Sequence, residues 1–193
     1  MPTELSTPAL PTDAGTVLLP LARAAIASRI GIEHRASAEA EWLHAIGATF
    51  VTLTQRARLR GCIGTLRAAR TLLDDVRHNA LAAAFSDPRF KPVTKEEYAT
   101  LSVEVSVLSP LTPLGFGDER DALTQLRPGV DGLVFEYGHH RSTFLPQVWD
   151  TYRDPAEFLG HLKYKAGLPP DFWDAEVKLS RYEVTKWREA QGQ

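Results

Sequence analysis

The sequence predicts an α+β fold with a largely antiparallel sheet. Segments with the two-residue period of strands and segments with helical periodicity are interspersed along the chain, without the regular spacing of βαβ units. Two pairs of strand-like segments are separated by short turns, which favours antiparallel hairpins. The 193 residues are 44% hydrophobic and 24% charged, which is ordinary for one substantial globular domain.

The N-terminal part predicts a tail, a helix and a hairpin. Residues 1–13 hold three prolines and little apolar periodicity, so we expect a mobile tail. Residues 14–28 place apolar side chains at helical spacing, and Pro20 indicates that the helix proper begins near it, where proline is tolerated. The hairpin consists of residues 49–54, which are rich in β-branched and aromatic side chains, and residues 59–64.

The middle of the chain predicts two helices and a strand. A helix fits residues 71–85, with Thr71 as its N-cap, and the Ser-Asp-Pro sequence at 86–88 ends it. Residues 94–97 have the pattern of a capping box, which starts a short helix. Residues 101–108 predict a strand with valines on one face and polar side chains on the other.

The C-terminal part predicts a short helix, a hairpin, a second helix and a last strand. The short helix is expected near residues 119–127, and the hairpin pairs residues 132–137 with 141–145. An aspartate N-cap followed by proline starts a helix over residues 154–166. Residues 176–184 predict the last strand.

Composition excludes several classes of protein. No apolar run approaches the roughly 18–20 residues that cross a bilayer, and no secretory signal is present, so we expect a soluble cytoplasmic protein without a membrane partner. The net charge of −2 gives no overall attraction to nucleic acid. Because Cys62 is the single cysteine, an internal disulfide, an iron–sulfur cluster and a multi-cysteine zinc site are excluded. We therefore expect no metal site and no cofactor in this chain, and we treat residues 14–190 as one domain.

Cys62 is the centre of the candidate site. On a strand, Arg60, Cys62 and Gly64 share a face, and neighbours on one face lie about 7 Å apart, so the guanidinium could favour the thiolate. Gly61 and Gly64 remove side-chain bulk beside the sulfur, which leaves room for a ligand. The alternative is that Cys62 packs as a small buried hydrophobic residue.

A group of arginines precedes the cysteine. Arg56, Arg58 and Arg60 alternate, so one strand face could present three positive charges to a phosphate group. No aromatic residue lies between Val51 and Ala84, so a base-stacking platform is missing there. The sequence favours an anionic small molecule or a solvated strand edge over nucleic acid.

Several strings of residues identify a family resemblance. The sequence LRGCIGTL at 59–66 resembles the signature of the AMMECR-domain family, and within that family the chain resembles protein A of the AmmeMemoRadiSam systems. Further strings occur in the family's order: DPRF at 87–90, VEVSVL at 103–108, PGVDGL at 128–133, FLPQVW at 144–149 and KAGL at 165–168. The resemblance covers roughly residues 15–187.

The resemblance implies a two-lobed α+β protein with an antiparallel sheet, flanking helices and a cleft between the lobes. It also implies that the protein works with a Memo-like protein and a radical SAM protein, but it specifies no reaction. Position 163 is lysine, where a second cysteine is expected in many relatives, so we do not expect a two-cysteine redox mechanism.

The family strings also select polar residues around the cysteine. Asp87 and Arg89 could hold an anionic substrate or pin the turn between them. Glu104 lies among valines, so it is either paired with an arginine, for which Arg60 and Arg89 are the natural partners, or a base. Gln147 caps a helix or binds a polar ligand. The candidate ligand-binding residues are Gly61, Gly64, Thr65, Asp87, Arg89 and Gln147.

Two functional hypotheses remain open from the sequence. In the first, Cys62 is a nucleophile or modification acceptor, Arg60 stabilises its thiolate and Glu104 accepts a proton. In the second, the protein is a non-catalytic adaptor or ligand-binding module in which Cys62 is structural.

Overall fold

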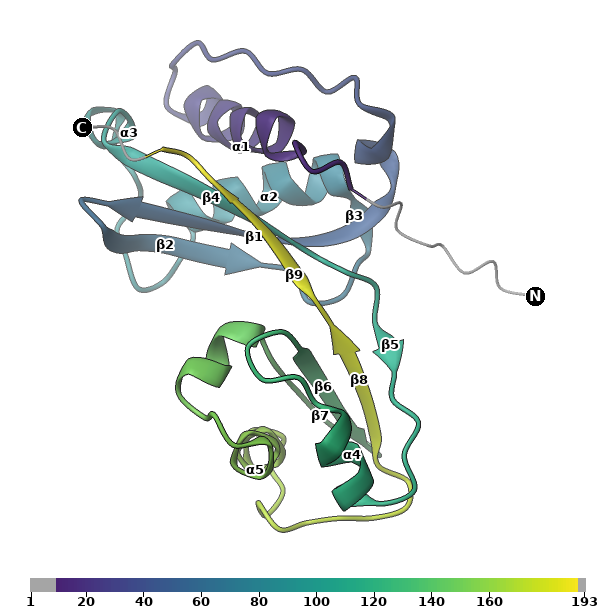
Figure 1. Cartoon of the computed structure of the whole chain (residues 1–193). Coiled ribbons are helices and arrows are strands. Elements are labelled where there is room, and N and C mark those ends of the chain that lie inside the picture. Colours follow the sequence, from purple (N-terminus) through teal and green to yellow (C-terminus); the bar gives the residue numbers. More distant parts are fainter. Residues whose placement is uncertain (1–9, 191–193) are drawn as a thin grey trace. The chain divides into compact units, whose positions relative to one another are not determined.

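The chain forms two units, each with its own sheet and its own hydrophobic core (Figure 1). The structure is a computed structural model, and it describes residues 10–190. Unit 1 takes the chain up to Ser109 and again from Thr185, and unit 2 takes residues 110–184. The predicted fold class, a two-lobed α+β domain with mainly antiparallel sheets flanked by helices, is confirmed.

The sheet of unit 1 has five strands in the order β2-β1-β4-β9, and the short β3 also pairs with β1. β2 is therefore an edge strand whose strand neighbour is β1. The strands are β1 (Ile46–Gln55), β2 (Arg58–Gly64), β3 (Arg70–Thr71), β4 (Leu101–Leu108) and β9 (Val184–Arg188).

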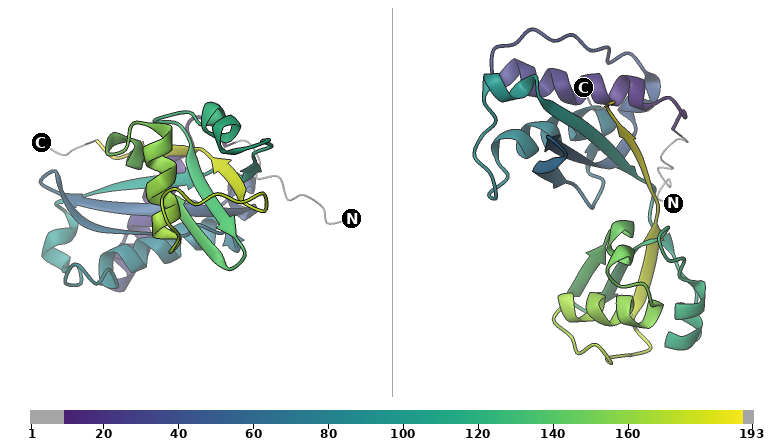
Figure 2. Two further views of the ribbon diagram at one scale, coloured as in Figure 1. Left: turned by 90° about the horizontal axis from the view of Figure 1, so that it is seen from below. Right: turned by 60° about the vertical axis from the view of Figure 1, so that its left-hand side comes forward.

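Two helices, α1 (Gly15–Arg29) and α2 (Leu72–Phe85), pack on one face of this sheet (Figures 1 and 2). Their apolar side chains form one core with the alternate strand residues Val51, Leu53 and Val103. Fully burying a side chain of this size contributes about 1.5–3 kcal/mol, so the helices stay on the face that carries the valines and leucines. The side chains between these residues, among them Thr52 and Glu104, therefore point to the opposite face.

Short elements complete unit 1. The 3₁₀ helix η1 (Glu41–His44) precedes β1, and α3 (Lys95–Tyr98) starts with the predicted capping box. The predicted N-cap of α2 is also confirmed, because the Thr71 hydroxyl accepts a hydrogen bond from the backbone N–H of Asp74 at 3.2 Å.

Pro20 does not mark the beginning of the first helix, and that expectation is wrong. α1 starts at Gly15, and Pro20 lies inside it. Pro20 removes one helical hydrogen bond, since it has no N–H to donate to the carbonyl four residues earlier. The buried side chains of Leu18 and Leu21 lie on either side of the proline, and their packing holds the helix through it.

The β1–β2 hairpin contains an irregularity that the sequence did not indicate. A two-residue turn, Arg56-Ala57, places Gln55 opposite Arg58. The register then shifts by one residue, because Thr54 lies opposite Leu59 whereas Leu53 lies opposite Gly61. Arg60 is thus the extra residue of a β-bulge.

Unit 2 has a four-stranded sheet in the order β5-β8-β6-β7. Its core is built from aromatic and leucine side chains of the sheet and of two helices, and the rings of Trp149 and Phe158 stack 3.7 Å apart. Asp154 caps α5 as predicted. The elements are β5 (Thr112–Pro113), α4 (Glu119–Gln125), β6 (Gly132–Tyr137), β7 (His140–Phe144), η2 (Pro146–Asp150), α5 (Pro155–Lys165) and β8 (Lys178–Tyr182).

The expected last strand, residues 176–184, corresponds to β8, and a further strand that was not expected, β9, follows it. β8 ends at Tyr182 and belongs to unit 2, whereas β9 begins at Val184 and pairs in the sheet of unit 1. Only Glu183 separates the two strands, so the local pattern gives no sign that the chain changes sheets.

The N-terminal tail was expected over residues 1–13, and residues 1–9 of it lie outside the described residues. Residues 10–13 lead into a turn before α1, where the Trp187 indole donates a hydrogen bond to the Thr12 carbonyl at 3.1 Å. Within the described chain, no helix has the length and apolar character needed to span a membrane.

Candidate functional site

Cys62 lies on the edge strand β2, opposite Thr52 of β1. The Cys62 thiol and the Thr52 hydroxyl are 3.2 Å apart, within hydrogen-bond distance for sulfur. Cys62 turns its backbone N–H and C=O away from β1, so the two residues form a non-hydrogen-bonded pair, in which side chains approach most closely. The cysteine is half-buried.

The neighbouring residue Gly61 shows which way the cysteine points. A Cβ atom on Gly61 would collide with the backbone carbonyl of Ala83, so this residue faces α2 at very close range. Cys62 therefore points to the other face, together with Thr52 and with Glu104, which lies opposite Thr52 on β4. We call the side defined by Cys62, Thr52 and Glu104 the polar face of the unit 1 sheet.

Asp87 and Arg89 hold the backbone of Cys62 from the outer edge of β2. The Asp87 carboxylate accepts the Cys62 N–H at 2.9 Å, and Arg89 donates to the Cys62 carbonyl at 3.2 Å. Two hydrogen bonds of 3.0 and 2.7 Å join the Arg89 guanidinium to Asp87, and the Arg89 N–H binds the same carboxylate at 3.1 Å. The pair both pins the turn and reaches the cysteine.

Electrostatics around Asp87 follow from this geometry. The hydrogen bond from the Arg89 guanidinium is the main reason that the pKa of Asp87 lies well below its ordinary range. The backbone N–H groups of Cys62 and Arg89 act in the same direction, and burial opposes them. In turn, Asp87 raises the pKa of Arg89, and a smaller contribution to that rise comes from Cys62.

Arg60 does not lie beside the thiol as the strand pattern predicted. The bulge breaks the alternation, and the Arg60 guanidinium instead binds Glu97 of α3 through hydrogen bonds of 3.1 and 2.9 Å. The hydrogen bond from Arg60 is also the main cause of the lowered pKa of Glu97. Arg89 is the guanidinium that contacts Cys62.

Glu104 is paired with Arg188 of β9 and not with either arginine named from the sequence. The two N–H donors of Arg188 lie 2.9 and 2.6 Å from one Glu104 oxygen. β9 was not predicted, so its arginine was not a candidate. Cys62, Thr52 and Glu104 occupy one row across β2, β1 and β4.

Gly64 and Thr65 have structural contacts of their own. A Cβ atom on Gly64 would collide with the Phe50 ring. The Thr65 hydroxyl donates to Asp75 of α2 at 2.8 Å. Gly64 therefore does not leave open space beside the sulfur, because the Phe50 ring occupies it.

Asp75 and Asn79 form a buried polar network that sequence reasoning missed. Asp75 is fully buried and accepts hydrogen bonds from the Thr49 backbone N–H and hydroxyl, both at 2.8 Å. Asn79 donates to the Thr49 carbonyl at 3.0 Å and to the Thr65 hydroxyl at 3.1 Å. The signal available was the four-residue spacing of Asp75 and Asn79, which places both on one face of α2.

Gln147, the remaining candidate, belongs to unit 2. It is exposed on η2, and the contacts around Cys62 that are given above all come from unit 1. Among residues 10–190, no group of three or more His, Cys, Asp or Glu side chains is arranged to hold a metal ion.

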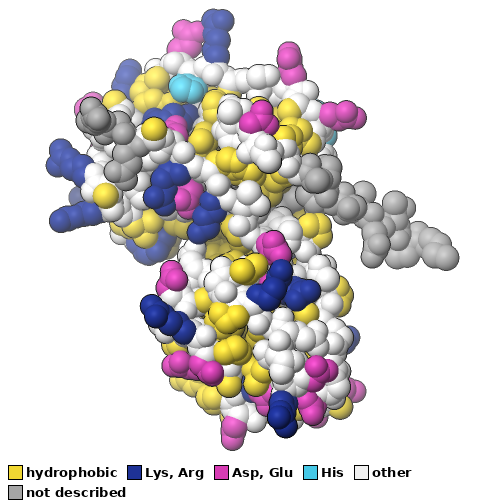
Figure 3. All heavy atoms as spheres, in the orientation of Figure 1, with side chains coloured by type: hydrophobic (Ala, Val, Ile, Leu, Met, Phe, Trp, Pro, Cys, Tyr) yellow, Lys and Arg dark blue, Asp and Glu magenta, His cyan; other side chains and the backbone are white. Residues whose placement is uncertain are grey.

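The arginines of the hairpin do not share one strand face. Arg56 occupies the turn, Arg58 is exposed at the start of β2, and Arg60 is paired with Glu97. Figure 3 shows basic side chains projecting over this end of the hairpin. The predicted row of three positive charges is therefore wrong, since one of the arginines is in the turn and another is neutralised.

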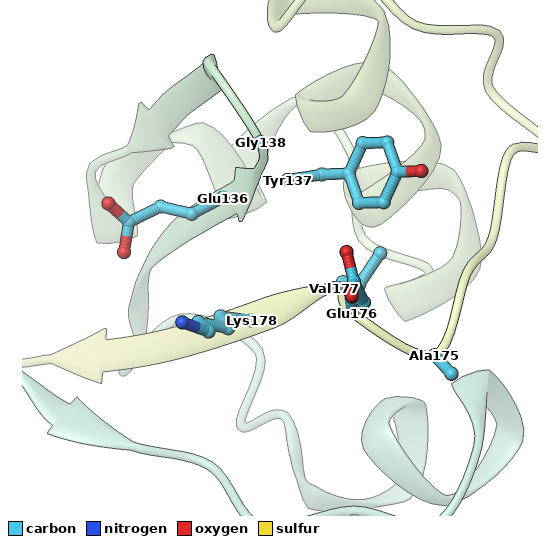
Figure 4. A pocket seen from close by; sticks show the side chains of 7 residues that line it. All are labelled: Glu136, Tyr137, Gly138, Ala175, Glu176, Val177 and Lys178. Carbon is cyan, nitrogen blue, oxygen red and sulfur yellow. The ribbon is translucent and has the colours of Figure 1, made fainter.

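Unit 2 contains a cavity of about 500 Å³ (Figure 4). Its lining residues are far from the cysteine motif along the sequence. Its two acidic residues differ, because Glu136 is paired with Arg141 at 3.1 Å and lies opposite Lys178, whereas Glu176 projects beside Val177. None of the predicted site residues lines it. The lining residues are Glu136, Tyr137, Gly138, Ala175, Glu176, Val177 and Lys178.

Comparisons with known proteins agree on one family. The family model described as AMMECR1 matches residues 19–187. Protein MJ0810 of Methanocaldococcus jannaschii is 44% identical over 135 residues, which cover 69% of this chain and 67% of that protein. A protein of Sulfolobus acidocaldarius is 35% identical over 189 residues, covering 93% of this chain and 83% of the relative.

A solved structure is also similar. The crystal structure of the uncharacterized protein PH0010 from Pyrococcus horikoshii matches with a TM-score of 0.78 and 34% identity, over 94% of each chain.

Proposed function

Since the chain belongs to the AMMECR1 family, whose signature string contains Cys62, we propose that it presents this cysteine as a nucleophile or modification acceptor on the polar face of the unit 1 sheet. One observation supports this most strongly. The thiol points away from the helices and meets the Thr52 hydroxyl, while the backbone on both sides of it is held by Asp87 and Arg89.

The chemistry follows from the position of each group. In the thiolate form, the sulfur attacks an electrophilic centre of the substrate, a bond to sulfur forms, and the substrate's leaving group departs with its electron pair. Thr52 donates a hydrogen bond to the sulfur anion. Glu104 accepts the proton that the thiol releases. Because β1 lies between β2 and β4, the two residues are about 10 Å apart along the sheet, so a water molecule or the substrate carries the proton.

Arg89 supplies the binding chemistry beside this nucleophile. Its side chain is 53% exposed, although it is anchored to Asp87. A half-exposed guanidinium suits a carboxylate or phosphate group, so we propose an anionic small molecule as the ligand.

The partner assignment depends on the family resemblance. We propose that the protein works in the cytoplasm with a Memo-like protein and with a radical SAM protein that supplies the cluster chemistry, since one cysteine cannot hold an iron–sulfur cluster. Co-purification of the three proteins at micromolar concentration tests this part separately.

The test of the proposed nucleophile is the rate at which iodoacetamide alkylates Cys62 in the native protein, followed by intact mass from about pH 6 to 10. We expect labelling of the folded protein, and the midpoint in the pH dependence of its rate marks formation of the thiolate. Thr52→Val should raise that midpoint, since it removes the hydroxyl and keeps the shape. Cys62→Ser, which has no thiol to alkylate, is the negative control. Labelling that occurs only after denaturation contradicts the proposal.

A second candidate function is an adaptor in which Cys62 only packs. It is favoured by the half-burial of the cysteine and by its existing hydrogen-bond partner. An adaptor predicts that Cys62→Ala retains partner binding and every cellular activity of the protein. Loss of that activity with binding intact excludes it.

A further inference from the structure

Among residues 10–190, no strand pairs with the outer edge of β2 at Cys62. The sheet order ends at β2, and Cys62 turns its N–H and C=O away from the neighbouring strand β1. Backbone groups at such an edge need partners from water, a ligand or another part of the chain.

Asp87 and Arg89 take the place of the missing strand at this one position. The carboxylate of Asp87 accepts from the Cys62 N–H, and the guanidinium of Arg89 donates to the Cys62 carbonyl, as a paired strand residue would. The two side chains are braced against each other by two hydrogen bonds, and the Asp87 side chain is only 1% exposed. Pro88 between them fixes one backbone angle of the turn.

We propose that the Asp87–Arg89 pair is a clamp that positions Cys62 and balances the charge around its thiol. This inference rests on the proposed role of Cys62 and adds the residues that control it. Asp87 and Arg89 are positioning residues here, because they act through the backbone and the field around Cys62.

Three ion pairs contribute charge around the Cys62 thiol, and each lies at a different position relative to it. Asp87 and Arg89 lie at the outer edge of β2, the Glu104–Arg188 pair lies beyond Thr52 on the polar face, and the Arg60–Glu97 pair lies further along β2. Thr52 is the neutral partner of the sulfur.

If the clamp balances charge, removing its negative or its positive side chain should change the thiol in opposite directions. A pair that only supports the structure would not have this effect. Asp87→Asn removes the negative charge and leaves Arg89, so the thiolate is favoured. Arg89→Met removes the positive charge and leaves Asp87, so the thiolate is disfavoured. The alkylation midpoint should therefore fall in the first variant and rise in the second, each by roughly half a pH unit. Arg89→Lys restores the charge and should bring the midpoint back toward that of the native protein.

A second measurement follows the clamp without using the reactivity of the thiol. Hydrogen exchange of the Cys62 amide should become roughly fivefold faster in Asp87→Ala, which removes the acceptor. Arg60→Met is the matched control, because it removes a paired arginine from the same strand and leaves the Cys62 backbone contacts intact. It should leave the exchange rate of the Cys62 amide unchanged, and thermal unfolding of each variant establishes that it is folded.

The outcomes separate the two proposals. Midpoints that move in the same direction in Asp87→Asn and Arg89→Met overturn the clamp, as does unchanged amide exchange in Asp87→Ala. If the native thiol is inert, the proposed function fails, and the amide exchange alone then decides the clamp.

Discussion

At the scale of single residues, the site is shaped by side chains that bind backbone groups. Asp87 accepts the N–H groups of both Cys62 and Arg89, and Asp75 accepts the N–H of Thr49. A buried carboxylate needs such donors, since leaving it unpaired away from water is costly. These residues therefore contribute to stability as well as to the geometry of the site.

Asp87 should make the stability of unit 1 depend on pH at the acid end. Its pKa in the folded protein lies below the value of about 3.9 for an unfolded aspartate, so folding favours the ionised form. The contribution is complete above about pH 5, and it is lost as the pH falls below 4 and through the folded pKa. Urea unfolding of Asp87→Asn should show a shallower loss of stability over this range than the native protein.

The exposed Asp13 provides the comparison, because Asp13→Asn changes an aspartate without a buried contact. It should follow the acid dependence of the native protein. An Asp87→Asn variant that loses stability as steeply as the native protein would show that other carboxylates cause the loss of stability at low pH.

The two glycines of the motif differ in what a methyl group would meet. Gly61 faces the Ala83 carbonyl of α2, which is fixed helix backbone, whereas Gly64 faces the side chain of Phe50, which can move without displacing a helix. We expect Gly61→Ala to reduce the free energy of unfolding by about 3 kcal/mol or more, and Gly64→Ala by about 1–2 kcal/mol. Urea denaturation of both variants checks the order. Equal losses would mean that α2 moves away from β2 as readily as the Phe50 side chain moves away from Gly64.

At the scale of elements, the β1–β2 hairpin departs from ideal geometry in two places. Arg56 and Ala57 both have positive φ, at 50° and 60°, in a two-residue turn that favours asparagine and glycine. A few residues further along β2, Arg60 forms the bulge. The turn stores strain, and the bulge sets the register of the cysteine.

Replacing Arg56-Ala57 by Asn-Gly should stabilise unit 1. A left-handed conformation costs a non-glycine residue about 1–2 kcal/mol, and the greater freedom of glycine in the unfolded chain offsets about 0.5–1 kcal/mol of the relief. The expected net gain is about 1 kcal/mol, read from urea denaturation. Ala99→Gly is the control, because Ala99 has a φ of −67° and should lose stability. A less stable Asn-Gly variant would contradict the strained turn.

At the scale of the whole molecule, the chain has two separate cores. The core of unit 1 draws on residues between Leu10 and Val107 together with Trp187, and the core of unit 2 lies entirely within residues 110–184. Unit 1 depends on the segment that begins at Thr185. In this segment, Glu189 accepts hydrogen bonds from Arg23 at 2.5 Å and from the Val103 N–H at 2.9 Å.

A fragment of residues 110–184 should therefore fold alone, whereas a fragment that ends at Ser109 should not reach the stability of unit 1. The first keeps every member of its core, and the second loses Trp187 and Glu189. Thermal unfolding by circular dichroism should be cooperative for residues 110–184. Failure of this fragment to unfold cooperatively would show that unit 2 requires unit 1.

Much of the fold could be predicted from the sequence, because its signals are local. The caps at Thr71 and Asp154, the box at 94–97 and the alternation of 101–108 each involve residues within one turn or strand, and the structure contains all of them. The strings of the AMMECR1 family likewise identified the fold before the tertiary contacts were known.

The arrangement around Cys62 was decided by the tertiary structure. Counted from the turn without a bulge, Cys62 would lie opposite Val51, on the face that carries the helices. The extra residue Arg60 moves it opposite Thr52, on the polar face. A shift of one residue depends on the packing of the whole sheet, so no local pattern reveals it.

The ion pairs were decided in the same way. Arg60 binds Glu97, Glu104 binds Arg188 and Arg89 reaches Cys62, although the sequence suggested other partners for the first two. An arginine can pair with any carboxylate that the fold brings within reach, and only the three-dimensional arrangement selects one. The sequence by itself therefore determined which residues form the motif. The tertiary structure decided which of them reach the backbone of Cys62, and it brought Thr52, which the sequence had not singled out, to the thiol.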